Sequence, residues 1–266
     1  MEKASLDFLR NLLNTISPSG YEEEAARVWT EWTGAFADTI EKDNHGNIMA
    51  GINPQGTPRV MLAGHIDEIG FMVTYIDEKG FLSFAPIGGH DIQIVQGMRV
   101  EVKTEQGRIR GLIGKKPIHL LDPDDRKKVP KYEDLWIDIG ARDGEEARSL
   151  VKTGDPVVSA YNFEELRNGL AVARAFDDKI GAFVVAEALR LLAADRPQAA
   201  VFAVATVQEE IGLRGARTSA YRLNPDIGIA IDVTFATDHP GMEGKEKKRF
   251  GEIRLGGGPV LARGPN

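Results

Sequence analysis

The stretch VMLAGHIDEIG (residues 60–70) decides the fold, because it joins an apolar run to a pair of polar side chains. Such a run is typical of a strand that is buried on both faces of an α/β sheet. His65 and Asp67 follow at its carboxyl end, and open α/β sheets place their sites at that end of their strands. We therefore expect a functional site directly after this strand.

Three further segments repeat the design of apolar residues followed by acids: VARAFDDKIG (172–181), AVATVQEEIG (203–212) and IGIAIDVT (227–234). The acids that they supply are Asp177, Asp178, Glu209, Glu210 and Asp232. Imidazole and carboxylate ligands without thiolate suit divalent ions such as zinc, cobalt or manganese. Two such ions repel each other, so a two-metal centre needs a bridging anion, for which Asp177 is the candidate.

A structural explanation exists for each segment taken alone. His65 could be an ordinary histidine at a strand end, although Asp67 could accept its second ring N–H, as metal sites usually require. Asp177 and Asp178 also suit the first turn of a following helix, where carboxylates stabilise the positive end.

The other two segments have similar alternatives. Glu209 and Glu210 could begin a solvated helix, and Asp232 could form a turn. Adjacent ionised acids repel each other when no cation is near. Four such coincidences in one chain are much less probable than any one of them, so the joint pattern favours a two-metal hydrolase.

The order of predicted elements indicates an α/β fold with an inserted β unit. Helical spacing in residues 5–17 and 21–36 predicts two helices, and a turn at Asn44 to Gly46 predicts a hairpin. Between about Gly70 and Tyr161 the pattern changes to short β runs, which is typical of a small barrel-like or sandwich-like unit. One short helix, EEARSLV, is expected within it.

After Asn162 the alternation of strands and helices resumes. The expected elements are a helix over about 178–194, a strand over about 199–206, a helix from about 213 and a strand over about 227–232. We therefore predict a discontinuous catalytic domain, residues 1–69 and 162–266, and an inserted β domain, residues 70–161.

Composition narrows the function classes. A net charge of −7 argues against a nucleic-acid partner, because binding phosphates requires clustered Lys and Arg. Without cysteine, neither disulfides nor thiolate metal sites can form. No apolar run is long enough to span a bilayer and no signal-peptide pattern is present, so the cytoplasm is the expected location and no membrane partner is expected.

The quoted segments resemble the dinuclear metallo-aminopeptidases, a family of glutamyl, leucyl and lysyl aminopeptidases that often form tetrahedral dodecamers and are sometimes labelled endoglucanases. The similarity extends from the first helix to the last residue and includes AGHIDEIG, IGGHD, GLIGKKPIHLL, LWIDIGA, GDPVV, ARAFDDKIG, VQEEIG, DVTFATDHPG and GGGPVLARGPN. It implies a mixed-sheet catalytic domain of the zinc-peptidase type with an inserted small β-barrel-like domain that makes dimers and shapes the pocket.

The resemblance also implies roles for the site residues. His65, Asp177 and Asp232 would hold one ion, Asp177 and Glu210 would hold the second, and both ions would be zinc or cobalt. Glu209 would be the general base, and Asp67 would orient His65. The implied reaction is hydrolysis of the first peptide bond of a short peptide by a water that the two metals activate.

One feature departs from the family. Relatives carry a further histidine near their C-terminus that completes the second metal site, whereas this chain ends at Asn266. Its other histidines, His45, His90, His119 and His239, do not lie in a matching segment. We expect a truncated, cleaved or incompletely recorded chain, or a shortened homologue in which the first metal binds better than the second.

Three functions follow from these observations. The first is a metal-dependent aminopeptidase, and the second is a non-catalytic or impaired homologue with an incomplete second metal site. The third, suggested only by the endoglucanase label, is a glycoside hydrolase, which typically uses two carboxylates and no metal. Acidic, basic and aliphatic substrate preferences all stay open, with His90 as one pointer to a substrate contact.

Overall fold

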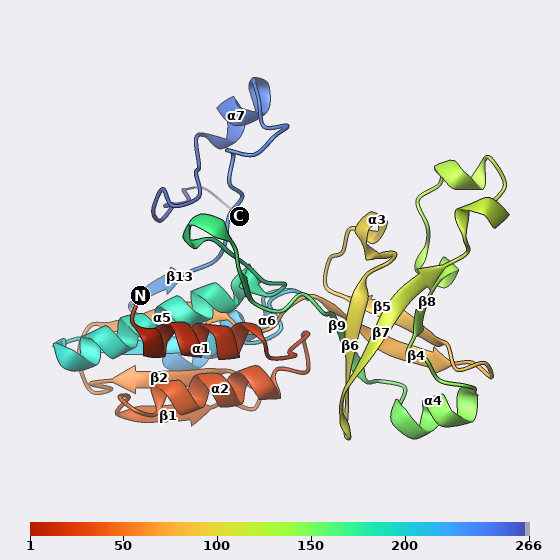
Figure 1. Ribbon diagram of the computed structural model, residues 1–266. Coiled ribbons are helices and arrows are strands. Elements are labelled where there is room, and N and C mark those ends of the chain that lie inside the picture. Colours follow the sequence, from red (N-terminus) through yellow and green to blue (C-terminus); the bar gives the residue numbers. More distant parts are fainter. Residues whose placement is uncertain (264–266) are drawn as a thin grey trace.

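The computed structural model describes residues 1–263, which form a layered α/β body and a closed β-barrel beside it (Figure 1). The last three residues of the predicted catalytic domain, 264–266, lie outside the described residues. The chain passes from the body into the barrel after β3 (Arg59–His65) and returns before α5 (Phe176–Ala194), and both of these elements carry residues of the predicted site.

The body is built on a mixed sheet in the order β1-β2-β12-β3-β13. Its strands are β1 (Thr39–Lys42), β2 (Ile48–Ile52), β3 (Arg59–His65), β12 (Ala200–Thr206) and β13 (Ile227–Ala230). β2 pairs antiparallel with β1 and β12, whereas β12, β3 and β13 run parallel. The parallel strands explain why the polar residues after them meet at one edge.

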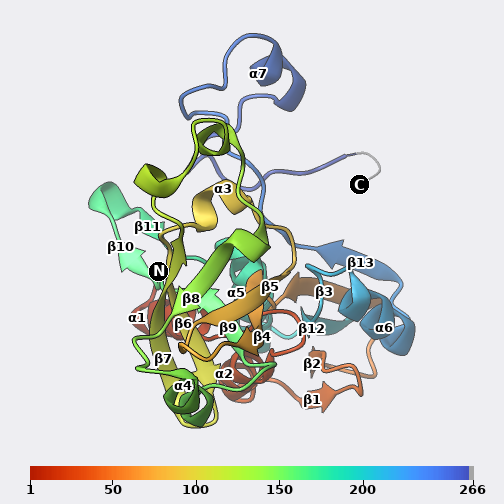
Figure 2. The same ribbon diagram turned by 90° about the vertical axis from the view of Figure 1, so that its right-hand side faces the viewer.

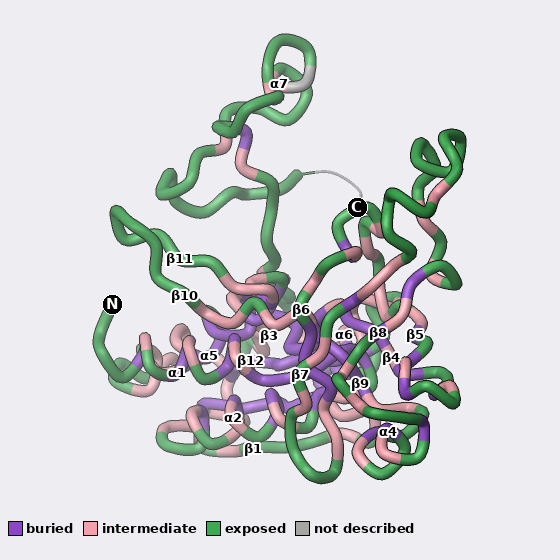
Figure 3. Tube along the Cα trace, turned by 45° about the vertical axis from the view of Figure 1, so that its right-hand side comes forward, coloured by how far each residue is buried: buried purple, intermediate pink, exposed green. Residues whose placement is uncertain are grey.

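Helices cover both faces of this sheet (Figures 1 and 2). On one face lie α1 (Lys3–Leu13), α2 (Glu23–Thr33) and α5 (Phe176–Ala194), whose apolar sides bury Phe8, Trp29 and Val185 against the sheet. On the other face α6 (Arg214–Leu223) places Leu223 in a smaller core. The tube in Figure 3 shows these buried segments gathered at the centre of the body.

Close packing of α5 on β3 depends on a glycine. A Cβ on Gly64 would lie 2.4 Å from the backbone nitrogen of Ala182, which is closer than any side chain tolerates. The start of α5 therefore lies directly over the end of β3, and this brings Asp177 and Asp178 to His65.

The barrel has the closed order β4-β5-β8-β7-β6-β9. Its strands are β4 (Gly70–Ile76), β5 (Leu82–Ile87), β6 (Arg99–Thr104), β7 (Gly107–Lys115), β8 (Leu135–Asp138) and β9 (Pro156–Ser159). Phe71, Val100 and Ile137 fill its interior. The expected short helix is α4 (Gly144–Leu150), with Asp143 as its cap.

The remaining elements are short. They are α3 (Ile92–Val95), β10 (Glu164–Glu165), β11 (Ala171–Val172), α7 (Lys245–Phe250) and the 3-10 turns Ile118–Leu120, Asp125–Lys127, Tyr132–Asp134 and Arg167–Gly169. None of the helices within residues 1–263 is long and apolar enough to cross a membrane.

The predicted fold class is confirmed, because the structure combines a mixed α/β sheet with a closed β-barrel. The strand expected over about 227–232 is shorter, since β13 ends at Ala230. Asp232 therefore lies in the loop beyond the strand, where its carboxylate accepts a hydrogen bond from the backbone of Val233.

Candidate metal centre

His65 is the buried centre of the candidate site. It is the last residue of β3, where it pairs in register with Thr206 of β12, and its side chain is 3% exposed. Its Nδ1 lies 3.0 Å from the carbonyl oxygen of Asp67. Because a carbonyl only accepts hydrogen bonds, Nδ1 carries the hydrogen and Nε2 is directed at the site.

Carboxylates surround that Nε2 atom. Oδ1 of Asp177 lies 3.3 Å away and Oε2 of Glu209 lies 3.7 Å away. His65, Asp177 and Glu210 offer ligand atoms within 4.8 Å of one another, and so do His65, Glu209 and Asp232. The four segments that the sequence analysis singled out therefore meet around one imidazole.

The two groups differ from the implied ligand sets in two respects. The resemblance groups Asp177 with His65 and Asp232, whereas the structure places Glu209 with that pair, and His65 rather than Asp177 is common to both groups. Glu209 thus stands where it could reach a cation as well as a water. Its assignment as general base stays a prediction.

Asp178 faces away from this cluster, although it is adjacent to Asp177 in the sequence. Both residues have non-helical backbone angles at the start of α5, and the peptide bond between them is cis. The carboxylate of Asp178 accepts the backbone N–H of His65 at 3.3 Å and that of Gly181 at 2.9 Å. Asp178 therefore joins α5 to β3, while Asp177 remains open to the site.

The carboxylate of Asp67 accepts hydrogen bonds from the backbone of the segment after β12. It is fully buried, and its Oδ1 accepts the backbone N–H of Glu209 at 3.0 Å. Its Oδ2 accepts the N–H of Glu210 at 3.2 Å and the hydroxyl of Ser19 at 2.6 Å. Its Oδ1 also lies 3.4 Å from Nδ1 of His65, farther than its backbone carbonyl oxygen, so the role of Asp67 in orienting His65 stays a prediction.

The charge distribution of the cluster favours a bound cation. Burial, together with the charge of Asp177, raises the pKa of Glu210 to about 7. Burial would lower the pKa of His65, but its hydrogen bonds with Asp177 and Asp67 outweigh burial and raise that pKa to about 11. In the absence of a metal the cluster therefore takes up protons, and a divalent cation would replace them.

Glu68, Arg174 and Lys179 form a buried ion cluster beside the candidate metal centre. Glu68 accepts hydrogen bonds from Lys179 at 2.7 Å and from Arg174 at 2.9 Å. All three side chains are at most 4% exposed. They lie close in sequence to His65 on one side and Asp177 on the other, so they tie the two segments together.

Neither this ion cluster nor the contact of Ser19 with Asp67 was predicted from the sequence. Arg174 and Lys179 lie in the same segment as Asp177, and charged residues within an apolar run are a usable signal of a buried pair. Ser19 offers no comparable signal, because a serine after a helix most often makes a turn.

His90 is held by the barrel. Its ring stacks on Phe71 with 4.3 Å between the ring centres, and its Nε2 lies 2.8 Å from the carbonyl oxygen of Gly70. The loop after β5, which carries His90, lies next to the candidate metal centre. A Cβ on Gly88 of this loop would lie 3.4 Å from the Cβ of Glu210.

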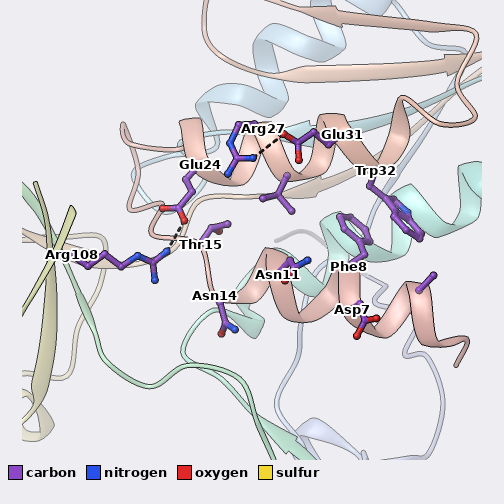
Figure 4. A pocket seen from close by; sticks show the side chains of 12 residues that line it. Asp7, Phe8, Asn11, Asn14, Thr15, Glu24, Arg27, Glu31, Trp32 and Arg108 are labelled. Carbon is purple, nitrogen blue, oxygen red and sulfur yellow. Dashed lines mark hydrogen bonds and ion pairs between the residues drawn. The ribbon is translucent and has the colours of Figure 1, made fainter. Parts of the chain in front are cut away.

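A groove of about 690 Å³ lies away from this cluster, between α1 and α2 (Figure 4). Its lining includes Asp7 and Phe8 of α1, Trp32 of α2 and Arg108 of the barrel strand β7. Arg108 forms an ion pair with Glu24 at 2.6 Å. No member of the candidate metal centre lines the groove.

Comparison with known proteins gives a consistent result. Residues 46–264 match the family described as M42 glutamyl aminopeptidase. The lysyl aminopeptidase of Pyrococcus furiosus is 34% identical over 263 residues, which cover 98% of this chain and 73% of that protein.

Solved structures agree with the sequence match. The TET aminopeptidase of a marine sediment archaeon of the Thaumarchaeota is 40% identical with a TM-score of 0.86, over 90% of this chain and 69% of that one. The TET1 peptidase of Pyrococcus horikoshii, which can assemble into a tetrahedron or a large octahedral shell, is 36% identical with a TM-score of 0.80, over 89% of this chain and 70% of that one. The chain thus spans about seven-tenths of the length of these proteins, and the fold is of the predicted peptidase type.

Proposed function

Because the chain belongs to the M42 glutamyl aminopeptidase family, a family of peptide hydrolases, we propose that it is a metal-dependent aminopeptidase that removes the N-terminal residue of short peptides. The observation that carries the proposal is the convergence of His65 with four carboxylates from three separate chain segments. Ionised carboxylates that lie this close together repel one another, and a bound cation would offset that repulsion.

The donor set fits a pair of divalent ions. One imidazole and four carboxylates, without thiolate, suit zinc or cobalt, and the Nε2 atom of His65 is directed at the cluster. In this proposal His65, Asp177 and Asp232 hold one ion, while Asp177 and Glu210 hold the other. When bound, the ions would lower the pKa of a water and polarise the peptide carbonyl.

The protein's own groups would then move the proton. Burial raises the pKa of Glu209 above its ordinary value, which makes the carboxylate more basic, and its side chain is 26% exposed and therefore accessible to a water. Glu209 would take the proton of the attacking water and deliver it to the leaving amine. The carboxylate of Asp67 would keep Glu209 in place by accepting the backbone N–H of Glu209, and the backbone carbonyl of Asp67 would fix the ring of His65.

Self-association is a further part of the proposal. The domain formed by residues 70–161 would contribute to dimers and to the wall of the substrate pocket. Exposed apolar side chains on the loop between β7 and β8 support this role, since Ile118, Leu120 and Val129 are 55%, 65% and 53% exposed. The shells formed by the Pyrococcus horikoshii relative are consistent with it. Light scattering of the purified protein tests the point, and a monomer would contradict it.

Hydrolysis of aminoacyl p-nitroanilides with acidic, basic and aliphatic residues tests the proposed activity. The protein should hydrolyse at least one of them, lose that activity in a chelator, and regain it when zinc or cobalt is added back. Hydrolysis that persists unchanged after exhaustive chelation would refute the metal-dependent mechanism.

A further inference from the structure

The loop between α1 and α2 reaches the candidate metal centre through one side chain, Ser19. This residue is 5% exposed, and its hydroxyl donates a 2.6 Å hydrogen bond to Oδ2 of Asp67. The bond is shorter than most between a hydroxyl and a neutral acceptor, as expected when the acceptor is a carboxylate. Because Asp67 is fully buried, bulk water cannot replace this bond.

Through Asp67 the serine is connected to both glutamates of the segment after β12. The carboxylate of Asp67 accepts the backbone N–H groups of Glu209 and Glu210 at 3.0 and 3.2 Å. Oδ2 is shared by the Ser19 hydroxyl and the Glu210 N–H, so loss of the hydroxyl removes one of the two hydrogen bonds that fix this oxygen.

The same loop holds this segment at a second point. Oε1 of Glu22 accepts the backbone N–H of Gln208 at 3.2 Å and that of Gly20 at 2.8 Å. Gln208 has a φ of 55°, a left-handed conformation that is unfavourable for a residue with a side chain. A segment that starts from such a conformation needs external contacts to keep its shape.

We infer that Ser19 is a positioning residue that sets the place of Glu209 and Glu210 by holding the carboxylate of Asp67. The inference rests on the proposed function only for its consequence in turnover, since the hydrogen bonds themselves are structural. Some groups do not bind the metal themselves but hold its ligands in place through hydrogen bonds. Removing such a group typically lowers metal affinity or activity by about tenfold to a hundredfold. Ser19 acts through one intermediate side chain, so the lower end of that range is expected.

Ser17 provides a matched control in the same loop. It is also buried, and its hydroxyl donates to the backbone carbonyl of Ile66 at 2.9 Å and to Oε1 of Glu68 at 3.4 Å rather than to Asp67. Ser17→Ala and Ser19→Ala therefore remove the same group, from the same loop, at a similar depth. A merely structural role predicts the same consequences for both.

The experiment compares the two variants with the parent protein in three measurements. These are kcat and KM on the best aminoacyl p-nitroanilide, the melting temperature, and the affinity of the metal-free protein for Zn²⁺ in competition with a chromophoric chelator. Ser19→Ala should lower kcat about tenfold and weaken Zn²⁺ binding about threefold to tenfold, with little change in KM. Ser17→Ala should change the melting temperature and leave kcat and Zn²⁺ affinity within about twofold. Equal kcat and Zn²⁺ affinity in the two variants would overturn the inference.

A double-mutant cycle with Asp67→Ala identifies the route, because alanine removes the acceptor of the Ser19 hydroxyl, whereas asparagine would keep one. If Ser19 acts through Asp67, then Ser19→Ala should have no further effect on Zn²⁺ affinity once Asp67 has been replaced. An undiminished effect in that background would overturn the inference. The cycle uses metal affinity alone, so it decides the role of Ser19 even if the protein proves to have no aminopeptidase activity.

Discussion

The Nε2 atom of His65 lies 3.3 Å from Oδ1 of Asp177, although the whole barrel separates the two residues in the sequence. Their proximity depends on the packing of α5 over β3, which Gly64 permits and the carboxylate of Asp178 secures. The candidate metal centre therefore forms only when α5, which follows the barrel in the sequence, packs on β3, which precedes it.

Replacing Asp177 should remove metal. We propose it as the carboxylate that bridges two ions, so Asp177→Asn would remove a ligand from both. Elemental analysis of the dialysed variant should find clearly less metal per chain than the parent protein retains after the same dialysis. A full complement of metal in the folded variant would show that Asp177 is not the bridge.

Replacing Glu209 should instead leave metal in place and abolish most of the turnover. The amide in Glu209→Gln has the same shape as the carboxylate but cannot accept a proton, so kcat should fall by about a hundredfold or more. Kinetics and metal content are measured on the same sample. Glu210→Gln is the matched control, and it should lose metal as well as activity.

Since Glu209 also groups with His65 and Asp232, the metal content of the Glu209 variant discriminates between two roles. Loss of metal from Glu209→Gln would identify it as a ligand. Full turnover with metal retained would show that it is not the base.

The buried ion cluster should contribute strongly to stability. Glu68→Leu leaves Lys179 and Arg174 buried without their carboxylate, and breaking such a cluster on one side typically costs about 3–5 kcal/mol. The free energy of unfolding in urea measures it. Glu105, which pairs with Lys152 at the surface of the barrel, is the control, and Glu105→Gln should leave that free energy unchanged. Equal effects of the two changes would contradict the account of the cluster.

Glu22 should make the stability of the metal-free protein depend on pH. Burial raises the pKa of its carboxyl from 4.5 to about 7. Between these values the unfolded chain loses the proton and the folded protein keeps it, so the contribution of Glu22 is fully present below about 4.5 and is lost as the pH rises through about 7.

The test is Glu22→Gln, which keeps an acceptor for the N–H groups of Gly20 and Gln208 and cannot ionise. Relative to the parent protein, the variant should gain about 3 kcal/mol of unfolding free energy between pH 4.5 and pH 8. Urea unfolding at both pH values, without metal, measures the difference. A pH-independent difference would show that Glu22 titrates normally.

The strands that carry the site could be predicted from the sequence because their signals are local. Each is an apolar run that ends in an acid or a histidine, and parallel strands of that kind deliver these residues to one edge. The structure brings His65, Glu209, Glu210 and Asp232 together at that edge. Asp177 is different, because the run before it forms the short exposed strand β11 outside that sheet, and Asp177 itself comes from the start of α5.

The supporting contacts could not be predicted in this way, because each joins segments that are distant in the sequence. The bond from Ser19 to Asp67 and the pairing of Glu68 with Lys179 depend on how the loop after α1 packs against the end of β3. No local pattern encodes that packing. The strand order of the sheet, with β12 between β2 and β3, is hidden for the same reason.

The most direct measurement of the central claim uses two short peptides of one sequence, one with a free amino terminus and one with an acetylated amino terminus. Mass spectrometry follows their cleavage by metal-free protein before and after Zn²⁺ or Co²⁺ is added. The account predicts that only the metal-loaded protein acts, and that it releases the first residue of the free peptide and leaves the acetylated peptide intact. Cleavage of both peptides, or cleavage by the metal-free protein, would contradict it.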